Sequence, residues 1–322
     1  TLRRKSGTSG FGIVRLGVES VPIMRARTCA PGLCVLENPT IHDSRLLSRP
    51  AAYLCEKGYP MHPMLTIAVK AARRAANIMQ RASSNLDLIR AEQKQHNDFV
   101  SEVDRAAEAA IIEIIREAYP THAILAEESG GAALDGEFVW IIDPLDGTTN
   151  YLHGYPQYAV SIALAQRGQV TQAVVYDPNR NDLFTASKGS GAFLNDRRIR
   201  VSKRISLTDS LVATGFPVSD LSYLDSYLAM FVDMLKKTAG VRREGAASLD
   251  LCNVACGRVD GFWELNLKPW DIAAGSLIVQ EAGGIVTDLF GEQGWLESGD
   301  IVAGNPKVLA QMLHALAPHV RH

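Results

Sequence analysis

Acidic side chains follow apolar runs at several places in the chain, where they could bind a metal ion. The clearest case is WIIDPLDGTTNYLHGYP, residues 140–156, in which Asp143 and Asp146 come at the end of an apolar run. A proline keeps the residue before it extended, so both carboxylates can project from a strand end, where open α/β sheets bind their ligands. Carboxylate oxygens suit hard cations such as Mg²⁺. The pattern is that of a cation site.

The residues that follow the second aspartate are small and polar. Gly147-Thr148-Thr149-Asn150 can open a turn or a short helix whose free N–H groups face an anion. A cation site beside an anion site would bind a phosphate through a metal. The same residues also fit an Asx-turn with an N-cap, and this stretch alone leaves both interpretations open.

Acids in two further segments favour the metal interpretation. In ILAEESGG, Glu127 and Glu128 follow a short apolar run, and in WELNLKPWDIAAG, Glu264 precedes Asp271. Each has a simpler explanation by itself. Glu127 could be a solvated loop acid, Glu264 could form a surface salt bridge, and Asp271 could cap a helix, worth about 1 kcal/mol. Acids with apolar flanks in three separate segments are harder to explain in these ways together.

Two long helices are expected ahead of these acids. Apolar residues at three- and four-residue spacings predict a helix from Met64 to Met79. A second helix starts near Ser101, where SEVD is a capping-box-like start, and it ends at Tyr119-Pro120.

The later elements read as a mixture of strands and helices. VWIID predicts a buried strand, and residues 158–195 predict several strands joined by glycines and a DPNRND turn. Further helices are expected at 222–237, at 247–256 and in WDIAAGSLIVQEAGG, which Gly283-Gly284 closes.

The first 60 residues differ from the rest of the chain. They carry a net charge of +5, against −7 for residues 61–322, and they show no helical or strand periodicity. Their Arg-rich, acid-poor start resembles a transit peptide, so a targeting segment is one alternative. We expect instead an N-terminal extension over residues 1–60, poorly structured or not native, with Met61 as the natural start.

Composition excludes several classes of protein. Hydrophobic content of 47% and charged content of 21% are those of a folded globular chain. A net charge of −2 gives no general affinity for nucleic acid or for acidic membranes, and no apolar run is long enough to span a bilayer. The five cysteines contain no C-x-x-C pair, which argues against a zinc site and for free thiols in a reducing, cytoplasmic compartment.

Three motifs, AEES, WIIDPLDGTTNY and WDIAAGSLIVQEAGG, resemble those of the inositol monophosphatase family of Mg²⁺-dependent, lithium-sensitive sugar phosphatases. The similarity runs from about Met61 to the C-terminus and is greatest to the bacterial inositol-1-monophosphatase branch. It implies a mixed α and β (α+β) fold, a layered αβαβα sandwich of the sugar-phosphatase type, with residues 61–322 as the catalytic domain. It also implies hydrolysis of inositol-1-phosphate and similar small phosphate esters with roughly two or three Mg²⁺ ions.

The resemblance assigns roles to individual residues. The metal ligands it implies are Glu127, Asp143, the backbone carbonyl of Leu145, Asp146 and Asp271. Asp143 would bridge two ions. Glu127 and the Thr148–Asp104 pair would be catalytic, because they would orient the attacking water.

The resemblance also implies a substrate site, with some departures from the family pattern. The matching positions are Asp146, Gly147, Thr148, Gly245, Ala246, Ala247 and Glu264. Lys94 is an uncertain member, because the family's lysine lies ten or eleven residues before Asp104 and Gln93 occupies the other position. Ala126 replaces a frequent glycine, with no expected loss of function. Ala246 stands where some relatives have threonine, which could alter ring specificity.

Two alternative functions accompany this interpretation. A bisphosphate nucleotidase or fructose-bisphosphatase relative would share the metal core, but the short step from Glu127 to Asp143 leaves little room for the insertions that larger relatives carry. Bacterial members of this branch are associated with transcription antitermination and ribosomal RNA synthesis. A regulatory binding protein, with RNA polymerase or antitermination factors as partners, is therefore the other alternative. A homodimer without membrane association is expected.

Overall fold

The computed structural model describes residues 61–95, 98–216 and 221–320, to which all structural statements below refer. The extension expected over residues 1–60 lies outside the described residues and stays a prediction. In the part that is described, no helix combines the length and the apolar composition that a bilayer crossing needs.

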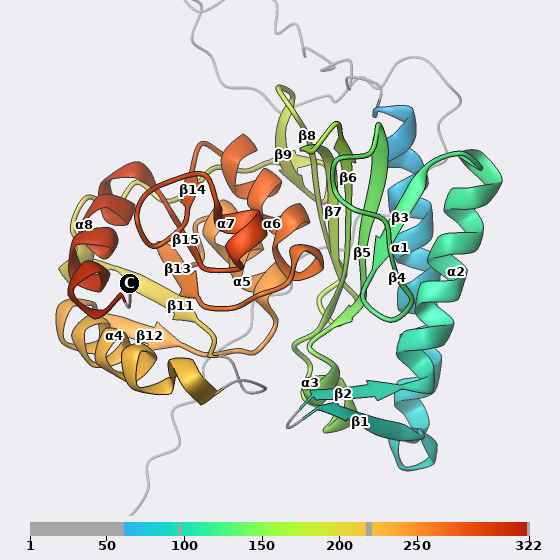
Figure 1. Ribbon diagram of the computed structural model, residues 1–322, viewed down its shortest axis with the longest axis horizontal. Coiled ribbons are helices and arrows are strands. Elements are labelled where there is room, and N and C mark those ends of the chain that lie inside the picture. Colours follow the sequence, from blue (N-terminus) through green and yellow to red (C-terminus); the bar gives the residue numbers. More distant parts are fainter. Residues whose placement is uncertain (1–60, 96–97, 217–220, 321–322) are drawn as a thin grey trace, which may run out of the picture. The chain divides into compact units, whose positions relative to one another are not determined.

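A large sheet is covered on one face by α1 (Pro63–Ala82) and α2 (Glu102–Ala118), as Figure 1 shows at its right. Alanines at the contact face of α1 let α2 approach closely, and the predicted capping box of α2 is present at Ser101. The strands, in order across the sheet, are β10 (Arg197–Arg198), β9 (Gly191–Leu194), β8 (Asp182–Ser187), β7 (Gln169–Asp177), β6 (Ala159–Gln166), β5 (Phe138–Asp146), β3 (Ala123–Ala126) and β4 (Gly130–Gly131).

The opposite face of this sheet packs on α5 (Ala247–Ala255) and α6 (Pro269–Glu281). Because both faces of β5 are covered, its side chains from Phe138 to Ile142 are apolar without alternation: Ile141 packs toward α6 and Ile142 toward α1. α6 is buried almost all round, as expected of a helix in a central layer.

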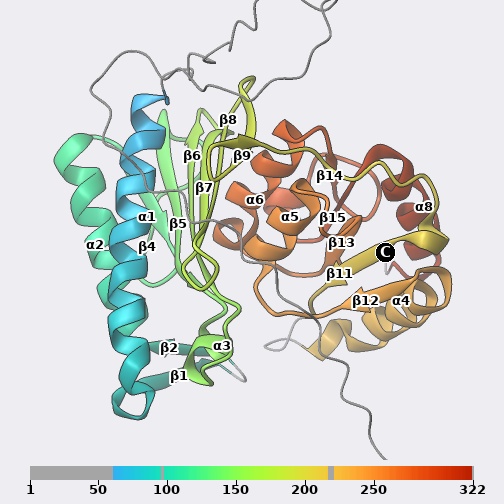
Figure 2. The same ribbon diagram turned by 180° about the vertical axis from the view of Figure 1, so that it is seen from behind.

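A second sheet lies on the far side of α5 and α6, and α4 (Leu224–Lys237) and α8 (Pro306–Leu316) cover its outer face (Figure 2). The layers thus alternate helix, sheet, helix, sheet, helix, which confirms the expected αβαβα sandwich. The strands of the second sheet, in order, are β12 (Gly240–Arg242), β11 (Leu211–Thr214), β13 (Gly261–Glu264), β15 (Ile301–Gly304) and β14 (Ile285–Thr287).

Smaller elements complete the described chain. A hairpin of β1 (Ala91–Gln95) and β2 (Asp98–Ser101) leads into α2, α3 (Thr148–Leu152) follows β5, and α7 (Trp295–Ser298) precedes β15. The 3₁₀ turns are Ser83–Leu88, Leu207–Asp209, Leu221–Tyr223 and Ala317–His319.

Strand direction brings the acidic segments together. Neighbours in the large sheet are antiparallel except β3 and β5, which run parallel. The carboxyl ends of parallel neighbours lie at the same edge of a sheet. Glu127, which follows β3, therefore lies beside the end of β5 with Asp143 and Asp146.

Candidate active site

The ends of β3 and β5 are fastened to each other. The backbone N–H of Glu127 donates to the carbonyl of Ile142 at 3.1 Å, which continues the ladder one residue past β3. Asp143 is buried, and one of its carboxylate oxygens accepts the N–H of Leu145 at 2.9 Å. Asp143 lies in strand β5, as the extended geometry expected before Pro144 requires, and its carboxylate is held against the backbone rather than pointing into solvent.

Asp146 bonds to the start of α5, far along the chain. Its Oδ2 accepts hydrogen bonds from the backbone N–H of Ser248 at 2.8 Å and from the hydroxyl of Ser248 at 2.5 Å. The N–H of Ala247 also bonds to this carboxylate. Ala246, the N-cap residue of α5, has no side chain that can cap, so Asp146 supplies the cap instead.

Asp271 lies in the first turn of α6, where its Oδ2 accepts the backbone N–H of Lys268 at 2.7 Å. Asp271 therefore caps the start of α6, as the simpler explanation of this residue proposed. A carboxylate has two oxygens, however, so capping α6 leaves Asp271 able to bind a cation as well.

These acids raise one another's pKa. Burial, followed by the charges of Glu127, Asp146 and Asp271, raises the pKa of Asp143 well above its usual value. Burial and the charge of Asp146 do the same to Asp271. Burial also raises the pKa of Asp146 to about 6, although the hydrogen bonds from Ser248 oppose the shift. The four carboxyl groups thus form one electrostatic cluster.

Three acids of this cluster have no ion pair with a basic side chain in the described part of the chain. None of the ion pairs among the described residues includes Asp143, Asp146 or Asp271. Within the same residues, no three acidic, histidine or cysteine side chains already stand as a metal cage. Mutually repelling, buried oxygen ligands are nevertheless the donor set that a hard divalent cation neutralises, so the residues present fit Mg²⁺.

Asp104 and Thr148 form the pair that the resemblance implied. The Thr148 hydroxyl lies 2.9 Å from Oδ1 of Asp104 and 3.0 Å from the carbonyl oxygen of Leu145. The other oxygen of Asp104 accepts the N–H of Ser101 at 2.9 Å. Asp104 is buried, and burial raises its pKa although the hydrogen bonds from Ser101 and Thr148 oppose this. The capping box of α2 thereby holds Asp104 against the loop after β5.

The loop after β5 packs directly on the segment before α5. Gly147 has φ +91°, and a Cβ there would come within 2.9 Å of the Gln157 carbonyl oxygen and 3.3 Å of the Gly245 carbonyl oxygen. Gly147 is thus required both by its left-handed backbone and by the close approach. The structure brings Gly245, Ala246 and Ala247 to the loop that contains Asp146 and Thr148.

Glu264 ends β13 and faces the same region. A Cβ on Gly215 would meet its Oε1 at 2.0 Å, so the carboxyl group packs directly on the backbone. Its side chain keeps some solvent contact, yet the surrounding atoms are dense enough that burial raises its pKa to about 8. Arg243, which lowers this pKa, lies 4.3 Å above the ring of Phe216. Glu264 forms no surface ion pair among the described residues.

Some residues of this region had no sequence signal. Ser248 bonds to Asp146, and Asp250 is buried with one oxygen that has no hydrogen-bond partner among the described residues. Burial and the charges of Glu264, Glu244 and Asp146 raise the pKa of Asp250 well above its usual value. Both residues read as ordinary members of a short helix. Lys94 lies in β1, but its side chain is outside the described residues, so its assignment stays a prediction.

The chain is similar to known proteins over most of its length. The model of the inositol monophosphatase family matches residues 60–322. A protein of Neisseria meningitidis serogroup B, whose name refers to the Nus factor SuhB, is 64% identical over 261 residues, which are 81% of this chain and 100% of that protein.

Two solved structures share the fold. The extragenic suppressor protein suhB of Bartonella henselae is 42% identical with a TM-score of 0.78, over 80% of this chain and 100% of that one. An inositol monophosphatase from Anabaena is 40% identical with a TM-score of 0.69, over 79% of this chain and 95% of that one.

Proposed function

The chain belongs to the inositol monophosphatase family, and on this premise we propose that it is a Mg²⁺-dependent phosphomonoesterase. Its substrates would be inositol-1-phosphate and similar small phosphate esters. The observation that supports this most strongly is that burial and the charges of neighbouring carboxylates raise the pKa values of Asp143 and Asp271, in a cluster of acids that lies beside the Asp104–Thr148 pair. Oxygen ligands for a metal next to a hydroxyl that can orient water are the groups that phosphate ester hydrolysis requires.

The proposed metal ligands are the carboxylates at the ends of β3 and β5, the Leu145 carbonyl and the first turn of α6. They are Glu127, Asp143, Leu145, Asp146 and Asp271. When bound, Mg²⁺ would offset the charge of the phosphate and lower the pKa of a water molecule.

Thr148 is proposed to hold the attacking water. Its single hydroxyl hydrogen points to Asp104 or to the Leu145 carbonyl, so its oxygen can accept a hydrogen bond from water. The oxygen of that water would approach phosphorus in line with the ester oxygen, and Glu127 would accept the proton that the water loses. Because the transition state is loose, the reaction requires that the water and the phosphate are correctly positioned, and it requires no covalent nucleophile from the protein.

The remaining groups would hold the two halves of the substrate. Gly147 and Thr148 would bind the phosphate. Asp146, Glu264 and the segment Gly245–Ala247 would contact the alcohol, because that segment packs beside Gly147.

The test is phosphate release from inositol-1-phosphate, a bisphosphonucleotide and fructose-1,6-bisphosphate in Mg²⁺. We expect inositol-1-phosphate to be hydrolysed best and Asp143→Asn to abolish release. The matched control is Asp196→Asn, on the exposed β9–β10 turn. Activity that persists in Asp143→Asn, or in excess EDTA, would contradict the metal mechanism.

We propose a second function in transcription antitermination, with RNA polymerase or antitermination factors as partners and the cytoplasm as the compartment. The naming of the Neisseria relative after a Nus factor favours it. The two functions separate in a deletion strain. Full complementation by Asp143→Asn would favour the binding role, and failure would tie the phenotype to hydrolysis. A homodimer is also proposed, and light scattering at micromolar concentration tests it.

A further inference from the structure

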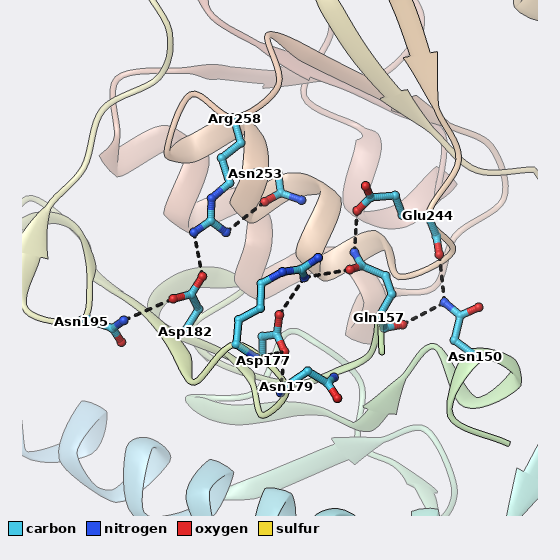
Figure 3. A network of polar contacts seen from close by, with 10 residues as sticks. Asn150, Gln157, Asp177, Asn179, Asp182, Asn195, Glu244, Asn253 and Arg258 are labelled. Carbon is cyan, nitrogen blue, oxygen red and sulfur yellow. Dashed lines mark hydrogen bonds and ion pairs between the residues drawn. The ribbon is translucent and has the colours of Figure 1, made fainter. Parts of the chain in front are cut away.

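Asn150, the amide that ends the DGTTN string, has no role in the hydrolysis described above. Its Nδ2 donates toward the backbone carbonyls of Gln157 at 2.8 Å and Glu244 at 2.9 Å (Figure 3), and toward that of Gly245 at 3.2 Å. Glu244 and Gly245 are more than ninety positions away along the chain. Asn150 therefore joins the loop after β5 to the start of the segment proposed to contact the alcohol.

Glu244 is held by its side chain as well as by its carbonyl. The Gln157 amide donates to Oε2 of Glu244 at 2.7 Å, and Gln157 Oε1 accepts from Arg180 at 2.9 Å. Arg180 is in turn paired with buried Asp177 at 2.9 Å. Since Asn150 also bonds to the Gln157 carbonyl, the two amides form one connected network around Glu244 (Figure 3).

The other end of the same segment is held by the same loop. Ser248 bonds to Asp146, which lies four positions before Asn150. The segment from Glu244 to Ser248 is thus fastened at its first residue by Asn150 and at its last by Asp146. Between these two attachments, Gly147 packs on Gly245 and Ala246.

We propose that Asn150 is a positioning residue for substrate selectivity, an inference that rests on the proposed function. Its amide sets the distance between the loop that holds metal and phosphate and the segment that contacts the alcohol. Three carbonyl oxygens that face one another need a donor between them. Alanine removes the donor, and aspartate would add a charge that repels all three.

The expected kinetic result is a change in the ratio of two substrates. Inositol-1-phosphate reaches the segment with a whole ring, whereas glycerol-2-phosphate offers the same phosphate with a small acyclic alcohol. We define the substrate ratio as kcat/KM for inositol-1-phosphate divided by kcat/KM for glycerol-2-phosphate. In Asn150→Ala we expect this ratio to fall about 10- to 100-fold, which is the order of loss that a misplaced binding group causes. Most of the change should be in KM for the inositol ester.

The matched control is Asn195→Ala, in the turn after β9. The Asn195 side chain donates a hydrogen bond to Asp182 (Figure 3) and accepts one from the N–H of Leu183. Neither partner belongs to the segment 244–248. Its substrate ratio should equal that of the wild type. Hydrogen exchange provides a readout independent of activity. In Asn150→Ala, the amides of Ala247 and Ser248 should exchange roughly tenfold faster than in the wild type. In Asn195→Ala, their exchange rates should equal those of the wild type.

Several outcomes would overturn the inference. An unchanged ratio in folded Asn150→Ala would do so, and so would an equal loss for both esters, which indicates a general structural role. If Asn150→Ala does not fold, Gln157→Met decides. It removes the bonds of the Gln157 side chain to Glu244 and from Arg180 but keeps the Gln157 carbonyl that Asn150 contacts. Its substrate ratio must fall in the same direction. A wild-type protein that hydrolyses neither ester refutes the proposed function itself, which is visible before any variant is made.

Discussion

Ser248 donates two hydrogen bonds to a single oxygen of Asp146, from its backbone N–H at 2.8 Å and from its hydroxyl at 2.5 Å. The two residues are 102 positions apart and both are buried. The contact ties the start of α5 to the end of β5. It also fixes the orientation of the Asp146 carboxylate, which is proposed to bind the metal.

The first prediction concerns the Ser248 hydroxyl. Ser248→Ala keeps the N–H bond but removes the hydroxyl bond, so Asp146 can rotate. We expect Mg²⁺ affinity, measured by isothermal titration calorimetry without substrate, to fall roughly tenfold, as for other residues that orient metal ligands. Ser187→Ala is the control, because it removes a hydroxyl bonded to Gln172. Equal affinities in wild type and Ser248→Ala would contradict the prediction.

The second prediction concerns Gly147. Gly147→Ala adds a methyl group at a left-handed backbone position and within 2.9 Å of the Gln157 carbonyl oxygen. Gly168→Ala, in the β6–β7 turn, shares the positive φ but has nothing within 4 Å. The backbone strain, about 1 kcal/mol, is common to both. We therefore expect kcat/KM to fall more than about 100-fold only in Gly147→Ala. Similar losses in both variants would assign the effect to strain alone.

The third prediction concerns metal and stability. A ligand that binds only the folded state stabilises it, by about 2.7 kcal/mol at a hundredfold excess over Kd, which corresponds to about 5–10 °C in Tm. Mg²⁺ should raise the Tm of the wild type and of Asp196→Asn by this amount. Asp143→Asn should lose most of the increase, because it removes the charge of a carboxylate proposed to bind the metal. Differential scanning calorimetry with and without Mg²⁺ measures the increase in Tm. An identical increase in the wild type, Asp196→Asn and Asp143→Asn would exclude Asp143 as a ligand.

The fourth prediction concerns pH. Burial raises the pKa of Glu264 from 4.5 to about 8, so the folded state binds this proton more tightly than the unfolded state. The resulting stability is fully present below pH 4.5 and is lost as pH rises toward 8. Glu264→Gln removes this dependence. In EDTA, the Tm of Glu264→Gln minus the Tm of the wild type should therefore increase as the pH rises from 4.5 to about 8. Below pH 4.5 this difference should stay constant.

The control for the pH prediction is Glu297→Gln, an exposed glutamate on α7. Its Tm difference from the wild type should not change over the same range. A constant difference for Glu264→Gln as well would show that the Glu264 carboxyl group is not held in a proton-binding environment.

Elements with a strong repeating pattern were predictable. The apolar stripe of α1, the capping box at Ser101, the buried strand β5 and the helix α6 all appear where their residues indicate. Each is long or carries its own boundary signal. The short strands β11, β12, β13 and β15 were not predicted, since three or four residues do not establish an alternation. They form because neighbouring segments supply their hydrogen-bond partners.

By itself, the sequence determined which acids could bind a metal and which elements present them. Asp143, Asp146 and Asp271 stand at recognisable element ends, because a strand end and a helix start leave local marks. Only the tertiary structure decided that Ser248 holds Asp146 and that Asn150 holds Glu244. Both contacts join segments that meet only after α5 packs between the two sheets. Packing of that kind depends on the whole core, and no local pattern encodes it.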